Sequence, residues 1–224
     1  MTPPPPATAD AAMPRHIAIE GPIGVGKTTL ARRLASTFDC DLLLEAPEQN
    51  PFLPRFYRNP RAVALQTQLF FLFQRVEQLR AVHQSDLFQP ARVADFLFAK
   101  DRLFAELNLD PDELALYLQV HAHLEPELPR PDFVIYLQAP TEVLLKRIQM
   151  RGIAHERAIN ADYLNRLNET YARYFLYFED APLLIVNAAT IDFANRDQDL
   201  QALVELIRER PRGRHYFNPS PQLL

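Results

Sequence analysis

The chain has 224 residues, of which 48% are hydrophobic and 23% charged, and this predicts one soluble globular domain with a sizeable core. A net charge of −4 argues against a broad nucleic-acid-binding surface, and no apolar run approaches the roughly 18 residues that a membrane span requires. Because residues 1–13 lack the basic and apolar segments of a secretory signal, and the one cysteine, Cys40, cannot form an internal disulfide, we expect a cytoplasmic protein.

Local composition divides the chain into three parts. Residues 1–14 are rich in proline, alanine and threonine and predict a disordered lead-in, residues 15–210 form one domain, and residues 211–224 form a C-terminal tail. Five short, nearly continuous apolar runs within the domain have the length of strands: His16–Glu20, Asp41–Glu45, Arg92–Leu97, Phe133–Gln138 and Leu183–Asn187. Longer helical patterns separate them, so we expect an α/β fold with a parallel sheet covered by helices on both faces.

Three helical segments carry specific signals. Apolar residues from Leu65 to Leu79 recur every three or four positions, and this stripe either packs inside the domain or meets a second subunit. Thr141 is placed to cap a helix that ends at Arg151, with Gly152 just beyond its end. Asn160 is placed to cap the next helix.

The strongest motif is Gly21-Pro-Ile-Gly-Val-Gly-Lys-Thr28, a full match to the phosphate-binding loop (P-loop) pattern G-x-x-x-x-G-K-[ST]. It follows a predicted strand and opens a predicted helix, which is the context in which backbone N–H groups and a helix N-terminus bind phosphate. Lys27 is expected to bridge the outer phosphates and the Thr28 hydroxyl to hold Mg²⁺. The residues expected to bind the nucleotide are Gly21, Gly24, Val25, Gly26, Lys27, Thr28 and Thr29.

Two carboxylates lie where predicted strands end near this loop. Parallel strands end at one edge of the sheet, and groups at that edge face the ligand crevice. We therefore expect Glu45 to act as the base for a substrate hydroxyl and Asp95 to bind Mg²⁺, directly or through water. The alternative is that both are solvated acids at strand ends.

A cationic cluster follows the fourth predicted strand. Arg147 and Arg151 are four residues apart and therefore share one helix face, from which they can clamp a γ-phosphate and stabilise its transition-state charge. The alternative is a solvated basic face near the helix C-terminus.

Taken together, these segments resemble the deoxynucleoside kinase family, especially its bacterial deoxyadenosine and deoxyguanosine kinase branch. The resemblance runs from His16 to about Phe178 and rests on EGPIGVGKTTL, LLEAPEQNPFLPRFY, LQTQLFFLFQR, PDFVIYL, RIQMRG and YLNRLNETYARYF. It implies a doubly wound five-stranded sheet, and transfer of the γ-phosphate of ATP, with Mg²⁺, to the 5′-hydroxyl of a deoxynucleoside, with purines favoured. It also implies a homodimer, because members of the family commonly pair through such helices.

The resemblance also implies roles for individual residues. Glu45 takes the place of the catalytic base, and Arg147 and Arg151 take the places of the lid arginines. The residues that correspond to acceptor-binding positions are Tyr57 at the 3′-hydroxyl, Gln66 at the base, Phe70 as a stacking aromatic, Asp101 as a second base-contacting acid, and Glu156 at the sugar.

The chain departs from the family pattern on the acceptor side. Where the family usually has D-R-S, this chain has Asp95-Phe96-Leu97, and Arg102 is the candidate to replace the missing arginine. The lid reads R-G-I-A-H-E in place of R-G-R-x-E-E. Two other functions therefore stay open: a kinase of another small alcohol or of a nucleoside monophosphate, and a nucleotide-binding protein without catalysis.

Overall fold

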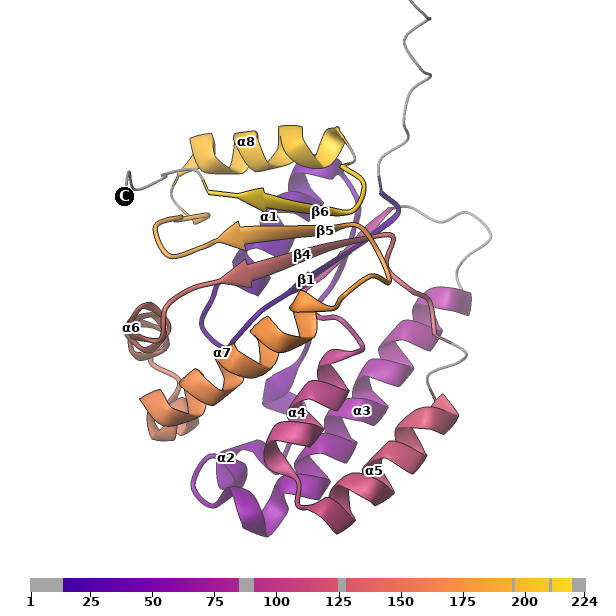
Figure 1. Cartoon of the computed structure of the whole chain (residues 1–224), viewed down its shortest axis with the longest axis vertical. Helices are drawn as coiled ribbons and strands as arrows, with labels where there is room; N and C mark the ends of the chain where they lie inside the picture. The colour runs from indigo at the N-terminus through magenta and orange to yellow at the C-terminus, as the bar shows by residue number, and fades with distance from the viewer. Residues whose placement is uncertain (1–13, 85–90, 125–127, 195, 210, 219–224) are drawn as a thin grey trace, which may run out of the picture.

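The computed structural model describes residues 14–84, 91–124, 128–194, 196–209 and 211–218, so nearly all of the predicted disordered lead-in lies outside the described residues. The fold is α/β, with a parallel sheet between two layers of helices (Figure 1). The strand order is β2-β3-β1-β4-β5-β6. The strands are β1 (His16–Glu20), β2 (Asp41–Leu43), β3 (Arg92–Ala94), β4 (Phe133–Gln138), β5 (Leu183–Asn187) and β6 (Arg214–Phe217).

The sixth strand corrects the prediction of a five-stranded sheet. β6 pairs in parallel with β5, from Leu183 opposite Arg214 to Val186 opposite Phe217, although the sequence assigns this segment to the tail. The segment Arg-His-Tyr-Phe carries no continuous apolar run because β6 is an edge strand, and Tyr216 is 71% exposed. Residues 219–224 of the predicted tail lie outside the described residues.

The helices are α1 (Lys27–Phe38), α2 (Leu53–Phe56), α3 (Pro60–Gln84, with a non-helical residue at Val63), α4 (Lys100–Asn108), α5 (Pro111–Leu124), α6 (Thr141–Arg151), α7 (Ala161–Leu176) and α8 (Asp197–Arg208). Helix α1 packs behind β1, β2 and β3, whereas α7 crosses in front of the sheet (Figure 1). Tyr171 and Phe175 of α7 stack on Tyr136 of β4. Helices α3, α4 and α5 pack together below the sheet (Figure 1). Within the described residues, no helix combines the length and apolarity needed to span a bilayer.

The apolar stripe of α3 packs inside the chain. Leu72 and Val76 are buried in one cluster with Ala105 of α4 and Tyr117 of α5. Of the two alternatives for this stripe, the structure shows the internal one, so the stripe no longer supports a subunit interface.

Of the three predicted helix ends, the cap at Asn160 and the stop at Gly152 are confirmed. The Asn160 side chain accepts a hydrogen bond from the Tyr163 backbone N–H at 2.9 Å, and Gly152 ends α6 in the left-handed region at φ 72°. The cap predicted at Thr141 is wrong, because Pro140 precedes the helix and the Thr141 hydroxyl instead lies 2.5 Å from Asn165 Oδ1 of α7. That contact ties α6 to α7.

Candidate functional site

The P-loop crosses from β1 to α1 in a conformation that its glycines make possible. Gly21 has φ 149°, and a Cβ there would lie 2.5 Å from the Leu137 carbonyl oxygen. Gly24 has φ 83°, and a Cβ there would lie 2.8 Å from the side chain of Ile148 on α6. Any other residue at these positions would strain the backbone and clash. The loop is therefore fitted closely beneath β4 and α6.

Lys27 folds back over the loop it follows. Its ammonium donates to the carbonyl oxygens of Gly21 at 2.7 Å and Pro22 at 3.2 Å. Burial, together with the positive charge of Lys100, lowers the pKa of Lys27 to about 8. A triphosphate would supply the opposite charge that this buried ammonium lacks among its carbonyl partners.

One side of the P-loop opens onto a crevice formed with α6 and with the segment after β5. Its lining includes Gly24 to Thr29 of the loop, Lys146, Arg147 and Arg151 of α6, and residues 189–194. Six of the seven predicted nucleotide-binding loop residues therefore line one opening, and Gly21 lies at the base of the loop, where it accepts from Lys27.

Arg147 lines this crevice, and its role toward a γ-phosphate stays a prediction. Its guanidinium donates to three backbone carbonyls, those of Val25 at 3.1 Å, Ala188 at 2.8 Å and Ile191 at 3.1 Å. These contacts tie the P-loop to the segment after β5 and use three of the five guanidinium N–H donors. In this arrangement Arg147 holds the wall of the crevice, and two of its N–H donors remain for a bound phosphate.

The strand order brings the predicted carboxylates together. β3 lies between β2 and β1, so Asp95, just after β3, lies between Glu45 and the P-loop. Its Oδ2 accepts from the Thr28 hydroxyl at 2.5 Å and its Oδ1 accepts from the Glu45 backbone N–H at 2.7 Å. Burial raises the pKa of Asp95.

The Thr28 and Asp95 oxygens are the hard donors that Mg²⁺ prefers. Mg²⁺ usually keeps several waters and takes substrate phosphates besides one or two protein ligands. Because Thr28 also borders the P-loop, this donor pair fits a magnesium ion that is shared with a triphosphate.

Glu45 is held by two cations to which the sequence analysis assigns no role. Its Oε1 is paired with Arg75 of α3 and its Oε2 accepts from the Lys100 ammonium of α4 at 3.1 Å. Burial alone would raise the pKa of the Glu45 carboxyl, but the charges of Arg75 and Lys100 outweigh burial and hold this pKa well below its usual range. Glu45 is therefore ionised and fixed in orientation.

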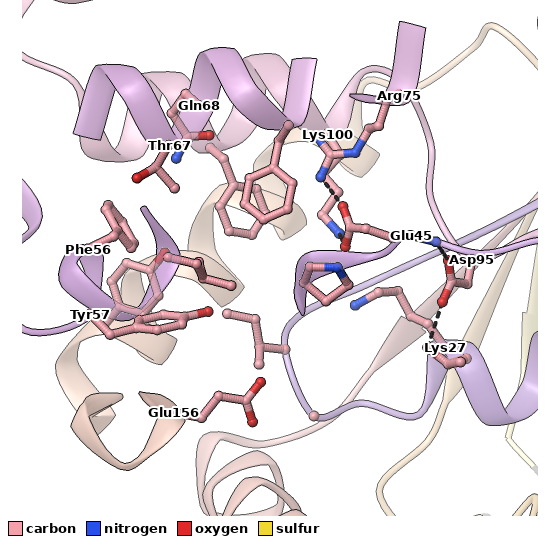
Figure 2. A pocket seen from close by; sticks show the side chains of 18 of the residues that line it. Lys27, Glu45, Phe56, Tyr57, Thr67, Gln68, Arg75, Asp95, Lys100 and Glu156 are labelled. Atoms are coloured by element: carbon pink, nitrogen blue, oxygen red, sulfur yellow. Dashed lines mark hydrogen bonds and ion pairs between the residues drawn. The ribbon is translucent and has the colours of Figure 1, made fainter. Parts of the chain in front are cut away.

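A second pocket extends from Glu45 away from the P-loop (Figure 2). Lys27, Glu45 and Asp95 lie at one end of the view, and Phe56, Tyr57, Thr67 and Gln68 at the other, with Glu156 below (Figure 2). Other lining residues include Phe71, Arg75, Lys100, Phe104, Arg151 and Tyr163. The pocket thus combines an ionised carboxylate at the end near the P-loop with aromatic and amide groups at the other end.

The glutamine that reaches this pocket is Gln68, and not Gln66 as the sequence predicts. Gln66 is exposed on the outer face of α3, which it shares with Phe73, whereas Gln68 is 2% exposed and lines the pocket. Gln68, Phe71 and Arg75 are spaced i, i+3, i+7 and so share one helix face. The spacing of Gln68 to Arg75 is the signal in the sequence that would have identified the correct face.

Three further predictions on the acceptor side need correction. Phe70 is absent from the pocket lining, where Phe71 takes its place. Arg102 points away from the pocket and pairs with Glu106 at 2.8 Å on the exposed side of α4, so it does not supply the missing cation. Asp101 is fully buried beneath the pocket wall and pairs with Arg75. It orients Arg75 and does not line the pocket itself.

The lid residues lie between the two openings. Arg151 borders both of them and donates to both carboxylate oxygens of Glu156 at 2.7 Å. Tyr57 lines the second pocket, which extends from Glu45, and stacks on His155 of the lid, with ring centroids 5.9 Å apart. Burial raises the pKa of the Tyr57 hydroxyl well above its usual value, so the hydroxyl remains a hydrogen-bond donor.

Glu20 is a buried carboxylate that no sequence motif marks. It accepts hydrogen bonds from the Gly21 backbone N–H and the Tyr171 hydroxyl, both at 2.8 Å, and from the Leu97 backbone N–H at 2.9 Å. It thereby fixes the start of the P-loop relative to α7 and to the segment after β3.

Comparison with known proteins agrees with this geometry. The sequence model described as deoxynucleoside kinase matches residues 17–210. A deoxyguanosine kinase of Bacillus subtilis is 36% identical over 201 residues, which cover 86% of this chain and 96% of that protein. A deoxyadenosine kinase of Dictyostelium discoideum is 30% identical over 215 residues, covering 91% and 83%. The fold is similar to that of deoxyadenosine kinase from M. mycoides with bound dATP, with a TM-score of 0.75, 24% identity, and coverage of 88% and 99%.

Proposed function

The chain belongs to the deoxynucleoside kinase family and is a phosphotransferase, and from this premise we propose that it transfers the γ-phosphate of ATP to the 5′-hydroxyl of a purine deoxynucleoside. The observation that carries the proposal is the position of Glu45. It lies in a pocket that has Lys27, Thr28 and Asp95 at one end and Gln68 and Tyr57 at the other. A nucleoside with its base near Gln68 and its sugar near Tyr57 would present its 5′-hydroxyl to the Glu45 carboxylate.

The acceptor is recognised by groups suited to a planar base and a sugar. The Gln68 amide offers one donor and one acceptor, which match a nucleobase edge. Phe71 and Phe104 supply aromatic surfaces on which a base ring can stack. Tyr57 and Glu156 also line the pocket, and we assign them to the sugar hydroxyls. A preference for purines is supported by relatives that are named deoxyguanosine and deoxyadenosine kinases.

The transfer follows from these positions. The 5′-oxygen attacks the γ-phosphorus, its proton passes to Glu45, and the bond from the γ-phosphorus to the bridging oxygen breaks, so that ADP leaves with that electron pair. Positioning and charge stabilisation supply most of the rate in such reactions. Lys27 and Arg151 line both openings and are the cations that we assign to the transferring phosphoryl group, and Mg²⁺ held by Thr28 and Asp95 would neutralise phosphate charge.

The proposal is tested by a screen that follows ³²P from labelled ATP in the presence of Mg²⁺. The acceptors are the four deoxynucleosides, the corresponding ribonucleosides, a nucleoside monophosphate and simple alcohols. We expect labelling of deoxyguanosine or deoxyadenosine above all others. Labelling confined to a monophosphate or to a non-nucleoside alcohol would overturn the assignment of the acceptor.

The corrected position of the glutamine gives a prediction with a matched control. Gln68→Ala removes the buried amide and is expected to raise the KM for the deoxynucleoside about 5- to 150-fold, since a lost hydrogen-bonding pair in a buried site costs about 1–3 kcal/mol. Gln66→Ala, two residues away on the exposed face, is expected to leave KM within about twofold. Steady-state kinetics on both variants measure this KM. A larger rise in Gln66→Ala than in Gln68→Ala would identify Gln66 as the residue that binds the base.

The expected homodimer and cytoplasmic location remain predictions. Phe73 is 52% exposed on the outer face of α3, and we propose that a second copy would cover it. Light scattering is expected to give twice the chain mass, and a mass near that of one chain would contradict the dimer.

A further inference from the structure

Lys100 is a buried cation in an unfavourable position. It is 5% exposed and is the first residue of α4, where the helix dipole is positive and disfavours a positive charge. Lys27 is a second nearby cation, and the repulsion between the two contributes to the lowered pKa of Lys27. Burial alone would lower the pKa of Lys100, but the charges of Glu45 and Glu20 outweigh burial and raise this pKa, so the ammonium stays charged.

What holds Lys100 in place is Glu45. The ammonium donates to Glu45 Oε2 at 3.1 Å while Arg75 pairs with Oε1, so each carboxylate oxygen has its own cation (Figure 2). The Lys100 ammonium also lies over the ring of Phe104, 5.6 Å from its centroid, in a cation–π contact. The two cations approach Glu45 from different helices, α3 and α4, and so fix the plane of the carboxylate.

The two cations differ in what else they do. Arg75 is shared, because it also pairs with the buried Asp101. Within the described part of the chain, Lys100 forms an ion pair with Glu45 and with no second carboxylate, and the charge of Glu20 acts on it from beyond ion-pair distance. Arg102, two residues along the same helix, is turned to solvent and cannot substitute for it.

We propose that Lys100 is a positioning residue for phosphoryl transfer, which acts through Glu45 by orienting its carboxylate toward the acceptor hydroxyl. This rests on the proposed function of Glu45 as the base. The lysine stays protonated throughout and transfers no proton itself; it fixes the oxygen that receives the proton of the hydroxyl.

A double-mutant cycle over Lys100→Met and Glu45→Gln tests the proposal with the full chain, ATP, Mg²⁺ and deoxyguanosine. We expect K100M to lower kcat about 10- to 100-fold while the KM for the deoxynucleoside and the Kd for ATP change less than about threefold. In the E45Q background, K100M is expected to change kcat less than about twofold, because residues that act as one unit are not additive. Lys100→Arg, which keeps the charge, is expected to restore most of kcat.

Two controls distinguish positioning of Glu45 from a general effect of charge or of folding. Arg102→Met removes a cation from the exposed face of the same helix and is expected to leave kcat unchanged. E45Q/K100M removes both members of the pair and leaves no unpaired acid, so its comparison with E45Q remains informative even if K100M alone unfolds.

Three results would overturn the inference. They are an unchanged kcat in K100M, an equal loss from K100M in both backgrounds, which would place Lys100 on the phosphate itself, and a loss that K100R does not restore. A wild-type chain that labels no deoxynucleoside would refute the proposed function instead, before any variant is compared.

Discussion

Replacing Glu45 with glutamine is expected to lower kcat by at least about 100-fold, which is within the range for removal of a general base. Glutamine keeps the shape of the side chain but cannot accept the proton of the attacking hydroxyl. The carboxylate lies outside the P-loop crevice that is proposed to hold ATP, so the Kd for ATP should change little. Rapid-quench measurement of the first turnover, with calorimetry for ATP binding, would show the loss in the chemical step alone.

Glu48 provides the control for this change. It is an exposed glutamate three residues beyond Glu45, and Glu48→Gln is expected to retain full turnover. Near-normal transfer by the Glu45→Gln variant would reject Glu45 as the base. A loss of ATP binding in that variant would instead show that the carboxylate supports the P-loop.

Lys27→Ala is expected to weaken ATP binding and transfer together. A hydrogen bond to a charged group contributes about 1.5–3 kcal/mol, which corresponds to roughly a 10- to 100-fold rise in the Kd for ATP. The loss in kcat/KM should be larger, because the phosphoryl oxygens carry more charge in the transition state. An unchanged Kd would show that the ammonium does not contact phosphate.

The lowered pKa of Lys27 adds a pH signature. With a pKa of about 8 in the free protein, part of the population is neutral at pH 8, and bound phosphate favours the charged form. ATP binding should therefore take up protons near pH 8, and affinity should fall as pH rises above 8. Calorimetry in buffers of different ionisation enthalpy measures this uptake, and Lys27→Ala should abolish it.

Local sequence was sufficient for the features that depend on a few neighbouring residues. The P-loop was predicted from one octapeptide, because its glycines and Lys27 act within a single turn. The strands β1, β4 and β5 were predicted with the bounds that the structure shows, as apolar runs covered on both faces. Glu45 and Asp95 were predicted to lie at the sheet edge, since parallel strands end together, although β2 and β3 stop before they reach these residues.

Other features were decided only by tertiary packing. Which face of α3 meets the pocket depends on how α3 packs on α4 and α5 along the neighbouring face of Leu72 and Val76, so composition alone could not separate Gln66 from Gln68. The edge strand β6 is stabilised by pairing with β5 and carries little apolar pattern of its own. The two cations on Glu45 come from α3 and α4, 30 and 55 residues beyond it in the chain. The sequence therefore determined where phosphate is expected to bind, whereas the packing of distant helices determined how the acceptor end is built, because its contacts join residues that no local pattern connects.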